Sequence, residues 1–152
     1  MSPELTRRRM ALFVFFFIPG ISMASWVTRT PAIRDHIHAS LAEMGMVLLG
    51  LSFGSMLGVL LSGLLVSLMG TKPIALLGTC LVPTGQIVMA LGAMAGLAPL
   101  VGLGLALFGF GMGLGEIAIN IEGAAVEQIT GKPLMHTLHG CFSLGTVCGA
   151  AL

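Results

Sequence analysis

Long apolar runs separated by short polar segments dominate this sequence. About 20 apolar residues of helix cross the hydrocarbon core of a bilayer, so each long run is predicted to be a membrane-spanning helix. The runs cover residues 10–28, 42–69, 73–95, 97–123 and 134–152. The last run is still apolar where the sequence stops, so we expect a chain that ends inside its fifth span.

The polar breaks between the runs carry helix start and stop signals. Ser40 and Glu43 have the spacing of a capping box, in which each side chain satisfies a free backbone amide of the other residue. Gly70 followed by Pro73 predicts that one helix ends and the next begins at once. Residues 131–133, Gly-Lys-Pro, predict the same before the fifth run.

Composition makes a water-soluble domain untenable. Hydrophobic residues make up 56% of the 152 residues and charged residues only 9%, whereas soluble domains carry about 25% charged residues. The sequence therefore predicts an all-α integral membrane protein embedded in a lipid bilayer. The net charge of +1 without a charged tail argues against nucleic acid as a partner.

The basic residues predict the orientation in the membrane. Arginines 7–9, Lys72 and Lys132 fall on one side, and Arg29 and Arg34 fall on the other. Cytoplasmic segments carry the excess of basic residues. The N-terminus is therefore predicted to be cytoplasmic.

Small residues recur at every fourth position of the second run. They are Gly50, Gly54, Gly58 and Ser62. Small residues at this spacing let two membrane helices approach closely, so this run is predicted to pack tightly against a neighbour.

The fourth run carries a polar face. At about 100° per residue, four residues fall within roughly 60° of one another, and three more extend this face. The four are Glu116, Asn120, Gly123 and Glu127, and the three are Gly109, Met112 and Gly113, while Glu122 points away. A carboxylate at the centre of a membrane helix costs about 2.5–3.5 kcal/mol, so this face is predicted to line a pathway. Buried there, Glu116 would load and release a proton and Asn120 would bind a polar ligand; the alternative is a structural glutamate tied to a neighbouring helix.

The first run has a second polar face. It is formed by Ser22, Ser25, Trp26 and Arg29. Trp26 is predicted either to stack against a flat ligand such as a sugar ring or to anchor the helix at the membrane boundary. Arg29 near the outer end of this run could pair with Asp35 or attract an anionic substrate. Alternatively, its long side chain places the guanidinium in the water at the membrane surface.

Catalytic and metal-binding patterns are weak. His136 and His139 share a helical face, but no third acidic or thiol ligand clearly joins them, so structural roles are favoured. Residues 109–115 alternate with glycine without matching a nucleotide-binding loop in register. We expect no enzymatic activity, no metal and no cofactor.

Three stretches resemble those of the major facilitator superfamily, and most closely its fucose-permease-like bacterial branch. They are residues 26–35 (WVTRTPAIRD), 115–120 (GEIAIN) and 134–140 (LMHTLHG). The resemblance implies the N-terminal half of a twelve-helix transporter with about five helices present and the C-terminal half absent, in a bacterial inner membrane. It also implies that Glu116 is the cavity glutamate of proton-coupled sugar uptake and that Asn120 is its polar neighbour.

Two departures from that family pattern matter. Residues 22–33 contain no acid, so the first-span aspartate of the family has no counterpart. The superfamily's gating-loop signature between the second and third spans is retained only at Gly63, Gly70 and Lys72; Ser67, Leu68 and Thr71 stand at its charged positions.

The sequence as a whole predicts a secondary transporter of a small polar, sugar-like solute, coupled to protons, whose two halves rock around a central site. Efflux of drugs or metabolites by the same fold is a close alternative. A small oligomeric channel or scaffold protein is another. Because one face of the bundle lacks its partner half, residues 1–152 alone are expected not to transport.

Overall fold

The computed structural model describes residues 3–152 and is built of helices. They are α1 (Pro3–Val27), α2 (Thr30–His36), α3 (Leu41–Met69), α4 (Thr71–Met94), α5 (Ala98–Thr130) and α6 (Met135–Ala151). Among these described residues, α1, α3, α4 and α5 are long and apolar enough to cross a membrane, and α6 has 17 residues. The predicted all-α membrane protein is confirmed at this level.

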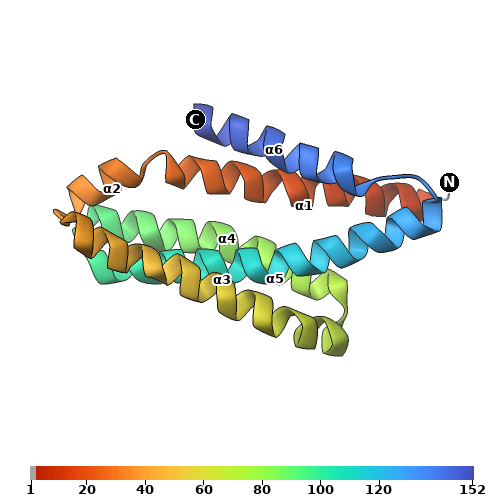
Figure 1. The fold of residues 1–152 in the computed structure, drawn as a ribbon, viewed down its shortest axis with the longest axis horizontal. Coiled ribbons are helices and arrows are strands. Elements are labelled where there is room, and N and C mark those ends of the chain that lie inside the picture. Colours follow the sequence, from red (N-terminus) through yellow and green to blue (C-terminus); the bar gives the residue numbers. More distant parts are fainter. Residues whose placement is uncertain (1–2) are drawn as a thin grey trace.

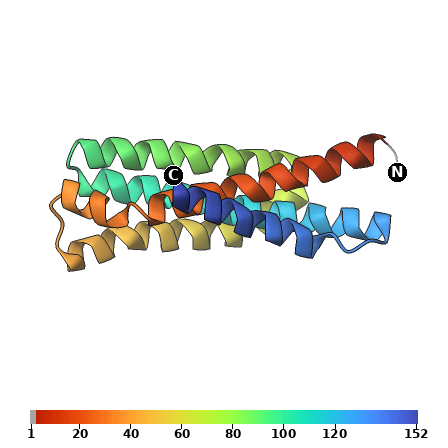
Figure 2. The ribbon, with the colours of Figure 1, turned by 90° about the horizontal axis from the view of Figure 1, so that it is seen from above.

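The long helices run side by side along the long axis of the molecule (Figures 1 and 2). They form two groups: α1 packs along α6, and α5 packs along both α3 and α4. Successive long helices reverse direction, so the start of α1, the α3–α4 connection and the α5–α6 connection lie at one end of the bundle. The basic residues predicted to be cytoplasmic belong to these three segments.

Helix boundaries differ from the apolar runs at both edges of the bundle. α1 begins at Pro3 rather than at residue 10, and α5 continues to Thr130 rather than stopping at residue 123. Hydropathy detects only the part suited to lipid, whereas the backbone hydrogen bonds of a helix continue into polar residues until a cap ends them. The short helix α2, which has Pro31 in its first turn, was not predicted.

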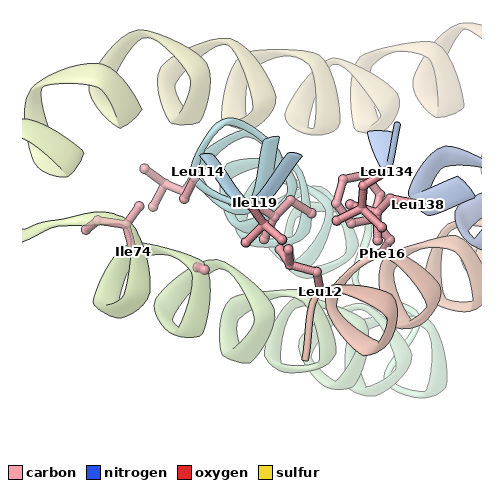
Figure 3. Close-up of a cluster of buried hydrophobic side chains, with 10 residues drawn as sticks. Leu12, Phe16, Ile74, Leu114, Ile119, Leu134 and Leu138 are labelled. Atoms are coloured by element: carbon pink, nitrogen blue, oxygen red, sulfur yellow. The ribbon is translucent and has the colours of Figure 1, made fainter. Parts of the chain in front are cut away.

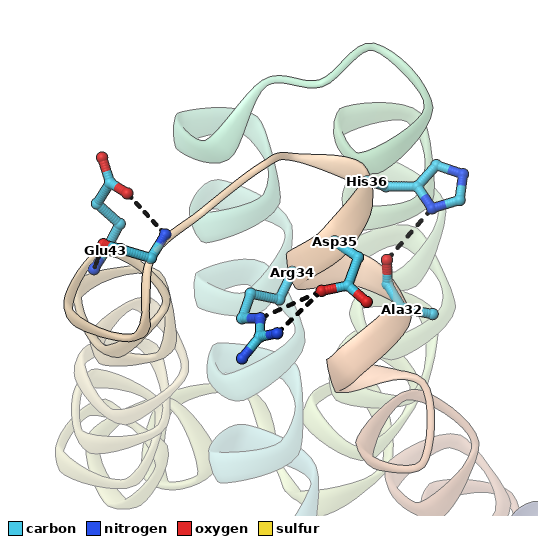
Figure 4. A network of polar contacts seen from close by, with 6 residues as sticks. Ala32, Arg34, Asp35, His36 and Glu43 are labelled. Carbon is cyan, nitrogen blue, oxygen red and sulfur yellow. Dashed lines mark hydrogen bonds and ion pairs between the residues drawn. The ribbon is translucent and has the colours of Figure 1, made fainter.

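The predicted caps are present. The Ser40 hydroxyl accepts a hydrogen bond from the Glu43 amide at 3.2 Å, and the Glu43 carboxylate accepts one from the Ser40 amide at 2.8 Å (Figure 4). Gly70 and Gly131 follow α3 and α5 with φ angles of 87° and 62°. Such positive φ angles favour glycine, so both helices stop where the sequence indicates.

Glycines hold α5 against both of its neighbours. A Cβ added at Gly54 or Gly58 of α3 would collide with the α5 backbone, and one added at Gly78 of α4 would lie 2.6 Å from the amide nitrogen of Gly115. The predicted close approach of the second run is confirmed. On α5 itself, Gly109 and Gly113 face the backbone of α3, so their predicted place on the pathway face is wrong: that side is filled by backbone packing.

A cluster of buried apolar side chains joins the two helix groups (Figure 3). It includes Leu12, Phe16, Ile74, Leu114, Ile119, Leu134 and Leu138. These residues come from α1, α4, α5 and α6, with Leu134 directly before α6. Burial of each large aliphatic or aromatic side chain stabilises a water-soluble fold by about 1.5–3 kcal/mol. In lipid the gain comes from close packing. The cluster fixes the α1–α6 pair against α5, beside the site described next.

Candidate functional site

A cavity of about 100 Å³ lies between the two helix groups. On one side it is lined by Phe15, Phe16 and Pro19 of α1 and by His139 and Phe142 of α6. On the other side it is lined by α4 and α5, including Thr79, Met112, Glu116 and Ile119. We call it the Glu116 cavity, because Glu116 is its one charged lining residue.

Glu116 reaches this cavity from α5 and is exposed rather than buried in the chain. Its carboxylate makes no hydrogen bond or ion pair with any of residues 3–152. A structural glutamate tied to a neighbouring helix is therefore not what the fold contains. The carboxylate is unpaired among the described residues and lies at the wall of the cavity.

Asn120 does not share the cavity. Its side-chain Nδ2 donates a hydrogen bond of 2.8 Å to the backbone carbonyl of Glu116, one turn back on the same helix. The two residues are neighbours along α5, as predicted, but the amide is turned onto its own helix. The Asn120 side chain therefore bonds to the backbone of its own helix and does not line the Glu116 cavity.

His139 was set aside in the sequence analysis, yet the fold places it in the Glu116 cavity. Its ring packs edge-on against Phe16, with ring centroids 5.2 Å apart and planes at 83°. Glycines at the α1–α6 contact allow this placement, since a Cβ on Gly145 would meet the Phe17 carbonyl at 2.5 Å. His139 lines the cavity because α6 packs along α1. No pattern within residues 134–140 predicts this position, since it depends on the contact between the two helices.

The first-helix candidates lie elsewhere. Trp26 is only 5% exposed, and its ring packs edge-on against Phe108 with centroids 6.0 Å apart. Trp26 is thus a core residue; it is neither a surface anchor nor open to a stacking ligand in this chain. Ser22 is buried too, and its backbone carbonyl accepts a hydrogen bond from Gln86 Nε2 at 2.9 Å.

Arg29 is used within the fold. Its guanidinium donates to the Ser25 carbonyl at 2.6 Å and hydroxyl at 2.8 Å, and to the backbone oxygen of Leu152 at 2.9 Å. Asp35, suggested as its partner, pairs instead with Arg34 at 3.0 Å (Figure 4). Arg29 therefore joins α1 to the end of α6 and does not contact Asp35.

A second, wider groove of about 700 Å³ opens near the start of α1. There the Glu122 carboxylate forms an ion pair with the Arg8 guanidinium at 2.6 Å and accepts a hydrogen bond from the Thr71 hydroxyl at 3.0 Å. We call Arg8, Thr71 and Glu122 the Glu122 cluster. It joins α1, α4 and α5. The cluster was not predicted, because Glu122 lies off the polar face of its helix.

The predicted gating-loop residues are spread around this end. Lys72 lines the wide groove and is exposed. Gly63 and Gly70 are exposed and have open space where a Cβ would stand. Within the described residues, Lys72 lines the same groove as Arg8, Thr71 and Glu122 of the Glu122 cluster. The gating role of the three residues stays a prediction.

Glu127 was also predicted on the polar face of α5, and the fold gives it another role. Its Oε2 accepts hydrogen bonds from the backbone amides of Leu134 at 2.6 Å and Met135 at 2.8 Å. These amides belong to the start of α6, where four backbone donors lack helical partners. Glu127 thus caps α6 from α5 and is not part of the cavity.

Glu127→Ala should therefore loosen the start of α6. Capping bonds of this kind are worth about 0.5–2 kcal/mol, so hydrogen exchange at the amides of Leu134 and Met135 should become several-fold faster. Gln128→Ala removes an exposed side chain one residue away and serves as the control. Unchanged exchange in the Glu127 variant would show that the cap contributes nothing.

No group of three or more His, Cys, Asp or Glu side chains among residues 3–152 is arranged to hold a metal ion. The four long apolar helices of the described residues are typical of a multi-pass membrane protein, and an unpaired carboxylate lies at a cavity between its two helix groups.

Comparison with known proteins narrows this class. The chain is 34% identical over 136 residues to an uncharacterized MFS-type transporter of Yersinia pestis, and 33% identical over 136 residues to the uncharacterized transporter y4wD of Sinorhizobium fredii. It is 29% identical over 136 residues to the membrane protein MosC of Rhizobium meliloti. The chain is therefore related to the MFS-type transporters, the major facilitator superfamily, which confirms the family resemblance.

The matches cover 88% to 90% of the chain and 32% to 35% of the three relatives, so the chain spans about a third of their length. No family model matches the chain. No solved structure gives a significant match. The fucose-permease-like branch stays a prediction.

Proposed function

We propose that these residues form one side of a secondary active transporter of a small solute, and that Glu116 carries the coupled proton. The observation that carries the proposal is the unpaired Glu116 carboxylate at a cavity between two separately packed helix groups. Ionisable groups in membrane segments are costly and are retained mainly for function. The relatives named as transporters support the same activity.

In this proposal the two sides rock around the site and expose it alternately to either face of the membrane. The other side comes from further chain or from a second copy of this one. Glu116 binds a proton on one face and releases it on the other, and no ion pair within residues 3–152 holds its carboxylate. The N-terminus is cytoplasmic and the membrane is the bacterial inner membrane.

Uptake and efflux use the same geometry, and the cavity favours neither direction.

The main alternative is a small oligomeric channel or scaffold, which exposed apolar side chains on α3 such as Phe53, Leu60 and Leu64 would also suit. A channel passes solute down its gradient without moving protons against theirs. Coupling therefore separates the two functions.

Glu116→Gln should abolish solute-driven proton movement while leaving solute exchange measurable. Glutamine keeps the size and polarity of the side chain but cannot carry the proton. The measurement is internal pH in proteoliposomes of the full-length transporter that contains these residues, after addition of a solute gradient.

Glu122→Gln is the matched control, because it removes a carboxylate from the same helix outside the Glu116 cavity. Undiminished proton movement in the Glu116 variant would refute the role proposed for this residue. Solute flux without any proton movement in the unaltered protein would favour the channel.

A further inference from the structure

Among residues 3–152, the Glu116 cavity is lined by one acid and by no lysine or arginine, and His139 is its other ionisable lining residue. The Glu116 carboxylate makes no ion pair within the described part of the chain, and Arg8 of α1 binds Glu122 instead. The carboxylate therefore has no fixed countercharge. An occupant that brings a positive charge is favoured at this cavity, and an anion is repelled.

The cavity also offers hydrogen-bond acceptors besides the Glu116 carboxylate. The Thr79 hydroxyl donates its proton to the Ala75 carbonyl at 2.8 Å, so its lone pairs face outward as acceptors. A neutral His139 ring offers one nitrogen acceptor. Glu116, Thr79 and His139 thus offer three acceptors, and an alkylammonium group has three N–H donors when it is primary.

The apolar walls suit the same occupant. Phe15, Phe16 and Phe142 line the cavity, and the faces of aromatic rings attract cations within about 6 Å. The volume of about 100 Å³ is below the roughly 150 Å³ of an apolar cavity that holds benzene. A small alkylammonium group fits this space, and a larger ligand body would extend out of the cavity.

We infer that the Glu116 cavity binds the ammonium group of a small organic amine, held by Glu116 with Thr79 and His139 as further acceptors. The inference rests on the proposed function, since it names the ligand class of the same site. A proton and an ammonium group each neutralise the one carboxylate, so they exclude one another there. Release of the amine frees the carboxylate to take a proton from water, which links the two movements.

The test uses residues 1–152 in lipid nanodiscs and three probes that share one carbon skeleton: isobutylammonium, isobutanol and isobutyrate. Binding is measured by saturation-transfer NMR at neutral pH, where an alkylamine is protonated. Isobutylammonium should bind saturably, and the alcohol and the carboxylate should not. Glu116→Gln should weaken amine binding at least roughly tenfold, since hydrogen bonds to charged groups are the strong ones.

His139→Phe keeps a ring against Phe16 but removes the acceptor, and it should weaken amine binding less than the Glu116 variant does. Glu122→Gln alters a carboxylate outside this cavity and should leave amine binding unchanged. Equal binding of isobutanol, or full amine binding in the Glu116 variant, would overturn the inference.

The two proposals fail separately. Proton movement that depends on Glu116, combined with no amine binding, would leave the transport proposal standing and remove the amine. Amine binding that depends on Glu116, without proton movement in proteoliposomes, would leave the amine site standing and remove the proposal of proton-coupled transport.

Discussion

Replacing Gly54 by alanine should push α3 away from α5 and destabilise the bundle. The added Cβ would collide with the backbone carbonyl of Ala106, and neither helix backbone can yield as a flexible side chain would. Overpacking of a tight contact costs about 1–3 kcal/mol, and occasionally more. The measurement is the midpoint of unfolding in detergent, which should fall by several degrees for a domain of this size.

Gly45→Ala is the matched control, since it lies on the same helix and a Cβ there would meet nothing within 4 Å. Alanine is the better helix former by about 0.5–1 kcal/mol, so this variant should be as stable as the unaltered chain or slightly more stable. If the two variants unfold alike, backbone contact between α3 and α5 is not what holds this group together.

Glu122→Arg should produce the second large effect, because it breaks the Glu122 cluster and faces Arg8 with a second guanidinium. Hydrogen bonds to charged groups contribute about 1.5–3 kcal/mol. The side chains of Arg8 and Glu122 are 37% and 26% exposed, and water screens such a pair. We therefore expect a loss of about 1–2 kcal/mol in the free energy of unfolding, with α1 separating from α4 and α5 first.

The exchange of charges supplies the control. The double variant Arg8→Glu with Glu122→Arg restores opposite charges at the same two positions and should recover most of the lost stability. A double variant no more stable than Glu122→Arg alone would show that the interaction depends on Thr71 or on packing rather than on the ion pair.

The arrangement of these contacts bears on transport. The Glu122 cluster joins α1 to α4 and α5 at one end of the bundle, and the Glu116 cavity lies between the same helices. Phe15 and Ile119 line both spaces. The two spaces therefore share these two apolar side chains but not their carboxylates, which is why Glu122→Gln serves as the control for Glu116→Gln.

Features that depend on local chemistry could be predicted before the fold was known. Apolar runs marked the long helices because a bilayer admits only segments that satisfy their own backbone groups. Ser40, Glu43, Gly70 and Gly131 marked helix ends because caps are read over a few residues. Glu116 stood out because a charge within an apolar run is rare and costly.

Which side chains contact one another depends on how the helices pack, and no local pattern predicts it. Glu122 binds Arg8, which lies 114 positions earlier in the sequence. His139 lines the Glu116 cavity because α6 packs on α1. Trp26, Glu127 and Asn120 satisfied a helical pattern equally well, yet packing turned them to Phe108, to the start of α6 and to the helix backbone. Helical periodicity gives the direction of a side chain about its own axis, and only the placement of neighbouring helices decides what lies in that direction.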